Sequence, residues 1–360
     1  MAIVKSILLN VFTGASATIA VLTVLVGYSD HLHPGAHPVL ACAGMTFPFF
    51  LIVNLIMFMV WLMVRWQRAW IPLLAFLLAF PAIRVYIPLH TPSSPPPGSI
   101  KVLSYNVACY TLIDKYRNPL DTIASYLERQ QADIVCLQED VNIRLNPEER
   151  MAAIYPYNDT VHVNIPSSPL INAIGMHSRY PILRKERIDY ESYGNGSVAF
   201  YLQVGDDTVI VVNNHLESTH LSESDRQRYN DMIRGGMNGE DAKAETRLLI
   251  GKLSTAMVKR APQAEAVARY IDCHRHYPII VCGDFNDTPI SYTRLTIAQG
   301  LTDCYVESGC GPGVSFNRSG FFFRIDQMMC SDHFEPYGCY VDNDMDASDH
   351  YPVICWLKWR

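Results

Sequence analysis

Apolar residues are concentrated in the first third of the chain, whereas apolar and polar residues alternate through most of the remainder. Residues 7–28 and 39–64 contain no charged side chain. In an α-helix with a rise of about 1.5 Å per residue, each stretch can cross a hydrocarbon core of about 30 Å. We therefore expect two membrane-spanning helices, with a cleaved secretory signal as the alternative for the first stretch.

A third apolar stretch, residues 69–89, is interrupted by Pro72, Pro81 and Arg84. We expect a third span here, and a buried helix of a soluble domain is the alternative. Residues 1–89 then form a membrane segment. Residues 90–99 form a stiff Pro/Ser-rich linker that holds the domain of residues 100–360 off the membrane.

The few basic residues of the membrane segment predict its orientation. Lys5 precedes the first stretch, Arg65 and Arg68 follow the second, and residues 29–38 contain no Lys or Arg. Because cytoplasmic loops carry the excess of Lys and Arg, three spans place the chain after residue 89 outside the cytoplasm. Two spans would reverse this assignment.

Short runs with the two-residue period of half-buried strands recur after Ser99. They are residues 100–110, 132–140, 172–178, 197–204, 208–218, 278–287, 324–331 and 351–359. Two of these runs, joined by Gly205-Asp206-Asp207, are typical of a β-hairpin. Helical periodicity occupies residues 119–131 and most of 221–274, with a break at 234–241. Hairpins together with helical crossovers predict an α/β fold, with two mixed sheets packed face to face and helices outside.

Polar residues capable of chemistry stand at the ends of these strand-like runs. They are Asn106, Glu139, Asn213, Asn214, His215, Asp284, Asn286, Asp326, Asp349 and His350. Any one of them could simply form a turn. Since strand ends in a two-sheet sandwich can converge on one rim, we expect this set to build a site there.

The runs that carry these residues resemble, in order, the motifs of the endonuclease/exonuclease/phosphatase superfamily. The matching segments are "SYNV", "LQED", "NNHLES", "GDFNDTP", "RID" and "SDHYPV", within about residues 100–359. The superfamily includes deoxyribonucleases, abasic-site endonucleases, neutral sphingomyelinases and inositol polyphosphate 5-phosphatases. The resemblance implies a four-layered α/β/β/α sandwich, here preceded by transmembrane helices, and the hydrolysis of phosphate esters.

The resemblance also implies a metal site. Glu139 is the expected ligand of Mg²⁺ or Mn²⁺, and Asn106 and Asp349 would support the same ion, directly or through water. A hard divalent cation held by carboxylates would neutralise charge on the phosphoryl oxygens. The structural alternative is a cluster of loops stabilised by calcium.

The remaining matched residues are expected to act on the substrate. Asp284 would orient or deprotonate the attacking water. Asn286 would donate to the phosphate from the same strand face, if the chain stays extended. His215 and His350 would be hydrogen-bond donors, preferably as imidazolium. Asp326 would pair with His350.

Charge bears on the substrate. Residues 100–360 carry 25 basic and 34 acidic side chains, a balance of −9. Without a dense basic stripe, attraction to a nucleic acid is weak. A membrane tether favours lipid head groups or small phosphodiesters as substrate. An endonuclease or exonuclease acting on nucleic acid is the alternative, a catalytically inactive binding module is another, and phosphomonoesters also remain open.

Two further sequence features leave alternatives open. Phe321, Phe322 and Phe323 are expected to fill the core, although they could contact lipid or stack on a base. Among ten cysteines, Cys304/Cys310 and Cys330/Cys339 are candidate disulfide pairs, while Cys136, Cys282 and Cys355 lie in apolar runs typical of the core. The cysteines therefore do not decide the cellular compartment.

Overall fold

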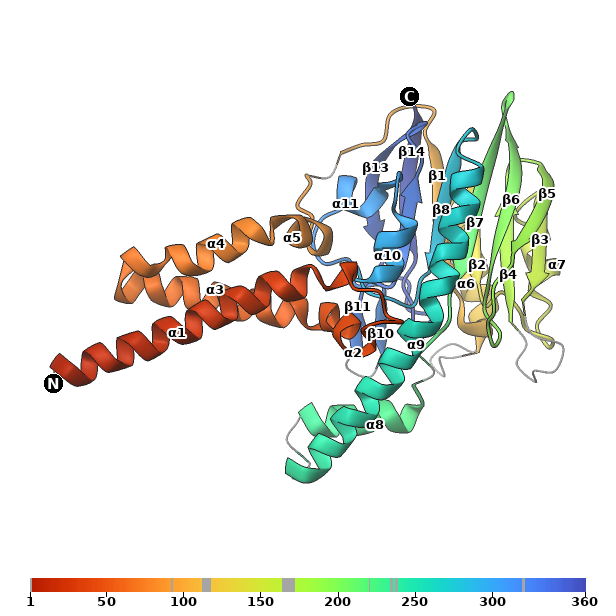
Figure 1. Cartoon of the computed structure of the whole chain (residues 1–360). Helices are drawn as coiled ribbons and strands as arrows, with labels where there is room; N and C mark the ends of the chain where they lie inside the picture. Colours follow the sequence, from red (N-terminus) through yellow and green to blue (C-terminus); the bar gives the residue numbers. More distant parts are fainter. Residues whose placement is uncertain are drawn as a thin grey trace.

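The computed structural model describes residues 2–91, 93–111, 118–163, 172–219, 221–233, 236, 239–318 and 321–360. Figure 1 shows a group of N-terminal helices that projects from one side of a sandwich of β-sheets. The N-terminal elements are α1 (Ala2–Gly27), η1 (Ser29–His31), α2 (Pro38–Ala41), η2 (Cys42–Thr46), α3 (Phe47–Val64), η3 (Trp66–Arg68), α4 (Trp70–Leu78) and α5 (Phe80–Tyr86).

Two N-terminal helical stretches, Val4–Gly27 and Pro38–Val64, are long and apolar enough to cross a membrane. The third predicted span is a pair of helices, Trp66–Leu78 and Phe80–Tyr86, bent by 63° at their junction. Pro81 lies at the start of the second helix of this pair, where proline is tolerated. The pair can serve as a third span only if both helices together form one crossing.

The first sheet has the strand order β13-β14-β1-β2-β4-β3. Its strands are β1 (Ile100–Asn106), β2 (Ile134–Gln138), β3 (Tyr157–His162), β4 (Ala173–Ser178), β13 (Phe334–Val341) and β14 (Val353–Trp359). β1 and β2 are parallel and are joined by α6 (Pro119–Gln130). The Asn118 side chain caps α6 by accepting from the Asp121 amide at 3.2 Å.

The second sheet has the order β5-β6-β7-β8-β12-β9. Its strands are β5 (Ile182–Ile188), β6 (Gly196–Val204), β7 (Asp207–His215), β8 (Ile279–Asp284), β9 (Thr302–Asp303) and β12 (Asp326–Cys330). The parallel strands β7 and β8 are connected through α8 (Glu223–Ile233) and α9 (Gly239–Cys273). The remaining elements are η4 (Ala108–Tyr110), α7 (Pro147–Ala152), α10 (Tyr292–Ile297), α11 (Cys304–Ser308), and the small hairpin of β10 (Phe316–Arg318) and β11 (Phe321–Phe323).

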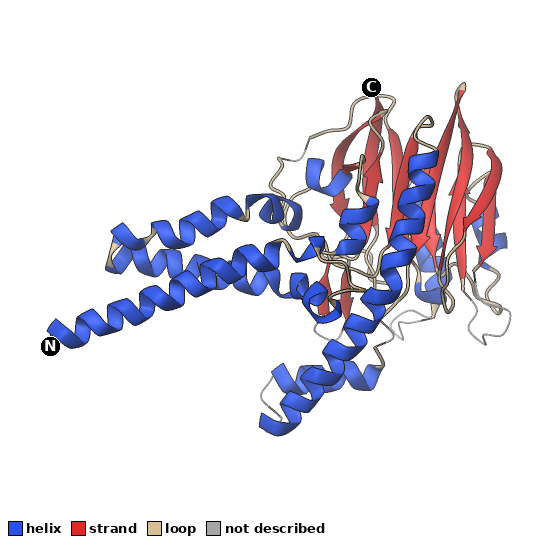
Figure 2. Cartoon of the chain, viewed as in Figure 1, coloured by secondary structure: helices blue, strands red, loops and turns tan. Residues whose placement is uncertain are grey.

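Three apolar cores hold four layers together, and Figure 2 shows the stacked sheets with helices outside them. The inner faces of the two sheets meet around Val102, Phe200 and Val211. Leu120, Ile123 and Leu127 of α6 cover the first sheet, whereas Ala264, Val267 and Ile271 of α9 cover the second. The predicted α/β/β/α sandwich is thus confirmed.

All eight strands expected from the sequence are present, including the hairpin of β6 and β7. The sequence pattern did not predict β3, β5, β9 or β13, nor the small hairpin of β10 and β11. The first four each lie at the edge of their sheet. Edge strands such as β5, "ILRKERI", carry exposed charges that obscure the alternation of apolar and polar residues.

The N-terminal segment packs directly against the sandwich, while the expectation that the linker holds the domain off the membrane stays a prediction. Ile290 of the sandwich packs in one apolar cluster with Val26 and Phe47 of the N-terminal segment. His33 Nε2 also lies 3.1 Å from Glu265 Oε1 on α9. Neither candidate disulfide pair is formed, because all ten cysteines are free thiols.

Candidate active site

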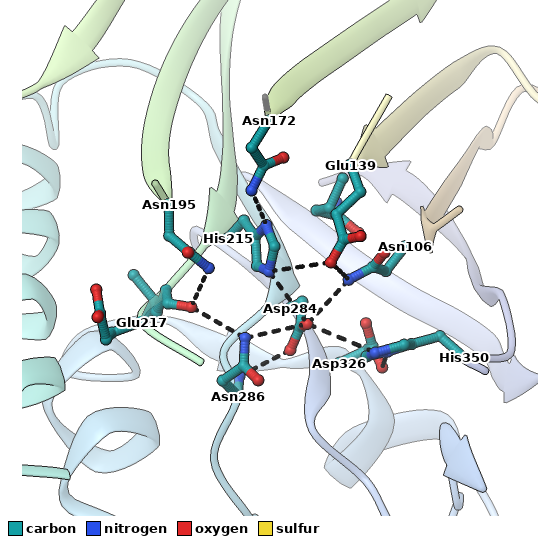
Figure 3. Close-up of polar contacts among 12 residues, drawn as sticks. Asn106, Glu139, Asn172, Asn195, His215, Glu217, Asp284, Asn286, Asp326 and His350 are labelled. Carbon is teal, nitrogen blue, oxygen red and sulfur yellow. Dashed lines mark hydrogen bonds and ion pairs between the residues drawn. The ribbon is translucent and has the colours of Figure 1, made fainter. Parts of the chain in front are cut away.

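The pairing of the second sheet brings three of the predicted residues into one row. His215 at the end of β7 is the register partner of Asp284 at the end of β8. Asp284 is in turn the partner of Asp326 at the start of β12. Asn106 and Glu139 approach from the ends of β1 and β2 in the other sheet, so the two sheets meet at this rim (Figure 3).

Unusual backbone conformations turn the site side chains inward. Glu139 and Asn286 adopt left-handed conformations with φ of 56° and 53°. Such strain in residues other than glycine is typical of functional sites. Gly283 has a φ of 125°, and a Cβ atom there would lie 2.0 Å from the Asn214 carbonyl oxygen. The "CGDFND" sequence therefore requires glycine at this position.

Asp284 is the centre of the polar network. Its Oδ2 accepts from Asn106 Nδ2 at 3.1 Å, and its Oδ1 accepts from the Asn286 backbone amide at 2.8 Å. His215 Nε2 and His350 Nε2 lie 3.6 and 3.7 Å from its Oδ2. Burial raises the pKa of Asp284, and the two histidines oppose that shift. These contacts hold the Asp284 carboxylate in place beside both histidines.

The backbone conformation and the contacts of Asn286 differ from those expected. β8 ends at Asp284, so the chain does not stay extended through Asn286. The Asn286 Nδ2 atom donates to the Leu216 carbonyl at 2.9 Å and to Asp284 Oδ2 at 3.2 Å. Since both contacts use the amide nitrogen, this geometry favours orienting Asp284 over donation to a phosphate.

The two histidines differ in their protonation. Burial lowers the pKa of His350, but the Asp326 and Asp284 carboxylates more than compensate and raise it to about 10. The expected contact with Asp326 is present, with His350 Nδ1 2.8 Å from Asp326 Oδ2. His350 is therefore an imidazolium at neutral pH, as expected.

His215 does not follow the same expectation. Burial lowers the pKa of His215 despite the neighbouring Asp284. Its Nδ1 atom faces the side-chain amide of Asn172 at 3.1 Å, which makes Nδ1 the acceptor and leaves Nε2 protonated. His215 is thus a neutral donor rather than an imidazolium.

The donor set suits a hard divalent cation. Burial raises the pKa of Glu139, and the charge of Asp349 raises it further. The carboxylates of Glu139 and Asp349 repel each other, and a divalent cation bound between such groups would relieve that repulsion. A second group is Asp284, Asp326 and His350, whose potential ligand atoms lie within 4.8 Å of one another. Because Asp326 and His350 hydrogen-bond to each other, we favour Glu139 and Asp349 as the ligands.

Asn106 is placed for support rather than direct ligation. Its Oδ1 accepts from the Ala108 backbone amide at 3.0 Å. Its Nδ2 donates to Glu139 Oε1 at 3.3 Å as well as to Asp284. Asn106 therefore bridges the two carboxylates and fixes their orientation.

The third acidic residue of "GDFND" has a role that the sequence did not indicate. Asp287 Oδ2 lies 3.4 Å from Arg260 Nε of α9, and both side chains are fully buried. Arg260 Nη1 also donates to the Glu217 carbonyl at 2.9 Å. Asp287 thus anchors the loop after β8 to α9. In the sequence, only the position of Asp287 next to Asn286 pointed to a role at this site.

A second buried network supports the turn at Glu139. Asp140 Oδ2 lies 2.9 Å from His177 Nε2, and Tyr110 donates to the other oxygen of Asp140. His177 Nδ1 lies 2.7 Å from Asn158 Oδ1. Sequence reasoning missed these residues because they are brought together from β3, β4 and η4.

The site opens into a cavity of about 220 Å³. Six of the eight predicted site residues line it: Glu139, His215, Asp284, Asn286, Asp349 and His350. Asn106 and Asp326 are buried beside it, bonded to Asp284 and His350. Met45, Leu253, Met257, Phe316 and Phe323 supply apolar parts of the wall. Phe323 lines the cavity and Phe322 is 57% exposed, so the expectation that these two fill the core is wrong.

Comparisons with known families agree with this arrangement. The model of the Endonuclease/Exonuclease/phosphatase family matches residues 103–350, which is more than half of the chain. Residues 9–86 match the model described as Domain of unknown function (DUF8431). The search of curated proteins gave no match.

Several solved structures have the same fold. The catalytic domain of human Nocturnin with bound sulfate is 15% identical, with a TM-score of 0.51, covering 73% of this chain and 94% of that one. Sphingomyelinase C from Streptomyces griseocarneus is 19% identical, with a TM-score of 0.50 and coverages of 72% and 99%. TDP2 from D. rerio, complexed with single strand DNA product, is 12% identical, with a TM-score of 0.50 and coverages of 72% and 99%. At these identities the likeness shows the fold alone.

Proposed function

Because the chain belongs to the endonuclease/exonuclease/phosphatase family, we propose that it is a divalent-metal-dependent phosphodiesterase held at a membrane by its N-terminal helices. We further propose that it acts on lipid head groups or small phosphodiesters. The observation that carries the proposal is the convergence of Glu139, Asp349, Asp284 and two histidines of different protonation on one cavity.

The metal is assigned to two carboxylates. Glu139 and Asp349 would hold Mg²⁺ or Mn²⁺, with Asn106 fixing the position of Glu139. When bound, such an ion neutralises charge on the phosphoryl oxygens and lowers the barrier to attack. Arg318 Nη1 lies 3.4 Å from Asp349 Oδ2 and partly balances its charge.

The protein's own groups account for the proton transfers. Asp284, oriented by Asn106 and Asn286, accepts a proton from the water that attacks phosphorus. As the bond between phosphorus and the leaving oxygen breaks, the imidazolium of His350 supplies a proton to that oxygen. Neutral His215 donates through Nε2 to the phosphoryl oxygens, where negative charge develops.

Charge and position support a lipid or small phosphodiester over a polynucleotide. The balance of −9 in residues 100–360 opposes long-range attraction to DNA. Met45 in the cavity wall belongs to the stretch Pro38–Val64, which is long and apolar enough to span a membrane. A tether of this kind raises the effective concentration of the enzyme at a lipid surface.

One observation favours a polynucleotide as a second candidate. A groove along α9, lined by Arg247, Lys252 and Lys259, shares Ser218 and Thr219 with the active-site cavity. Lys252 is paired with Asp225 and Lys259 lies 3.8 Å from Glu217. These pairs reduce the net positive charge that the groove could offer to a phosphate backbone.

Hydrolysis of bis-p-nitrophenyl phosphate by the full-length protein tests the proposal. We expect turnover with Mg²⁺ or Mn²⁺ and none in excess EDTA, with slower turnover of the monoester p-nitrophenyl phosphate. Parallel assays on sphingomyelin, phosphatidylinositol-type lipids and plasmid DNA test the substrate class. A correctly folded protein that hydrolyses none of these esters with either metal would favour the inactive binding module.

A further inference from the structure

The N-terminal segment forms part of the active-site cavity itself. Met45 lies in η2, between α2 and α3 and within the candidate span Pro38–Val64, and it lines the same cavity as Asp284 and His350. We propose that Met45 and the apolar residues around it bind the hydrocarbon part of an amphiphilic phosphodiester whose phosphate lies at the carboxylates. This inference rests on the proposed function and narrows its substrate class to lipids.

Close packing fixes the segment at this position. Gly44 lies so near the loop after β8 that a Cβ atom would be 2.0 Å from the Ile290 carbonyl oxygen. Ala41 and Cys42 form a buried cluster with Leu253 and Met257 of α9, and Met45 packs against that cluster. The segment is therefore packed firmly in place as one wall of the cavity.

The cavity has polar and apolar walls of different origin. Most of its polar residues lie at strand ends or in the loops that follow them, although Arg260 lies on α9. Its apolar residues come from η2, α9 and the β10–β11 hairpin, together with Leu221 and Ile325. Met45, Phe316 and Phe323 are only partly buried and can contact a ligand. A polar nucleophilic centre bounded by apolar side chains matches a ligand with a phosphate and an adjoining hydrocarbon chain.

Size indicates where the rest of such a ligand must lie. A cavity of about 220 Å³ holds the volume of about seven water molecules. That volume accommodates a phosphodiester group and its nearest carbons, so longer chains must extend past the partly exposed wall. Met45 lies two residues before α3, whose helix belongs to the candidate span Pro38–Val64. The wall is thus continuous with the part of the chain that would lie in the bilayer.

A chain-length series tests this wall directly. The full-length protein in nanodiscs would be assayed on monomeric phosphatidylcholines with acyl chains of four to seven carbons. If chains contact the wall, kcat/KM should rise by up to about fourfold for each methylene buried. Met45→Gln should flatten this dependence, whereas Met45→Leu, which stays apolar, should preserve it.

The matched control is Leu40→Gln. Leu40 belongs to the same segment, is 56% exposed and lies outside the cavity lining. The kcat/KM of Leu40→Gln should therefore depend on acyl-chain length as it does in the native protein. If Met45→Gln fails to fold, Phe323→Ser provides a second test, because Phe323 lines the same cavity from the β10–β11 hairpin.

Three outcomes would overturn the inference. One is a native kcat/KM that does not change with chain length while bis-p-nitrophenyl phosphate is hydrolysed. Another is a fall in the kcat/KM of Met45→Gln by the same factor for every acyl-chain length, which would indicate a structural role for Met45. The third is faster cleavage of a dithymidine phosphodiester than of any lipid, which would assign the apolar wall to bases. Failure to hydrolyse any diester would instead reject the proposed function.

Discussion

His350 Nδ1 lies 2.8 Å from Asp326 Oδ2, although the two residues are separated by 24 positions in the sequence. Asp326 begins β12 in the second sheet, and His350 lies just before β14 in the first. The other oxygen of Asp326, Oδ1, has no hydrogen-bond partner among the described residues. The pair therefore joins the sheets at the rim and keeps one imidazolium charge beside Asp284.

The raised pKa of His350 makes stability depend on pH. Protonated His350 stabilises the fold fully below its ordinary pKa of 6.5, and this contribution is lost as the pH rises to about 10. In EDTA, the free energy of unfolding should fall over this window by at most about 1.4 kcal/mol per pH unit. Thermal unfolding of the detergent-solubilised protein measures this fall. His350→Asn should flatten the profile, and an unchanged slope would contradict the assignment.

Asp326→Asn should lower activity by removing the charge that keeps His350 protonated. We expect kcat/KM for bis-p-nitrophenyl phosphate to fall by about 10²- to 10⁴-fold at neutral pH. The fall should be smaller at acidic pH, where His350 regains its proton. Asp344→Asn, at an exposed position outside the cavity lining, is the control. A loss that is the same at every pH would argue against this role.

Glu139→Gln should remove metal binding together with activity. The substitution keeps the shape of the side chain but removes one of the two charges that we assign to the cation. Titration calorimetry with Mn²⁺ should show binding to the native protein and at least about tenfold weaker binding to the variant. Retention of native affinity would instead point to the group of Asp284, Asp326 and His350.

The buried pair of Arg260 and Asp287 should show strong coupling. Arg260→Met leaves Asp287 buried without its partner and should cost about 3–5 kcal/mol of unfolding free energy. Adding Asp287→Asn should recover part of that loss, because asparagine can still bond to Thr288 and Thr293. Chemical denaturation of the four proteins gives the coupling energy. Additive losses would show that the pair is not coupled.

The orientation of the N-terminal segment can be tested with reporters. Lys5, Arg65 and Arg68 on the cytoplasmic side predict an external sandwich if there are three spans. Alkaline phosphatase fused after Ser99 should then be active in bacterial cells. An inactive fusion, with a cytoplasmic reporter active at the same position, would indicate two spans or the reverse orientation.

The sequence by itself predicted most of the local structure and a set of candidate site residues. The interior strands β1, β7 and β8 are recognisable because they are apolar runs that end in polar residues, a pattern carried within a few positions. The matched motifs also named all six site residues that line the cavity. The apolar stretches of the N-terminal segment were recognisable from their length and composition, which are local properties and do not depend on contacts with other segments.

Only the tertiary structure decided which of these residues meet and in what state. Burial leaves His215 neutral, whereas two carboxylates keep His350 charged, although in the sequence both histidines simply stand at the end of a strand-like run. Asp287 faces Arg260, and Met45 joins a cavity made by residues more than 90 positions away. These contacts depend on strand register and on packing between distant segments. Desolvation and charge pairing arise from that packing, so no local pattern in the sequence encodes them.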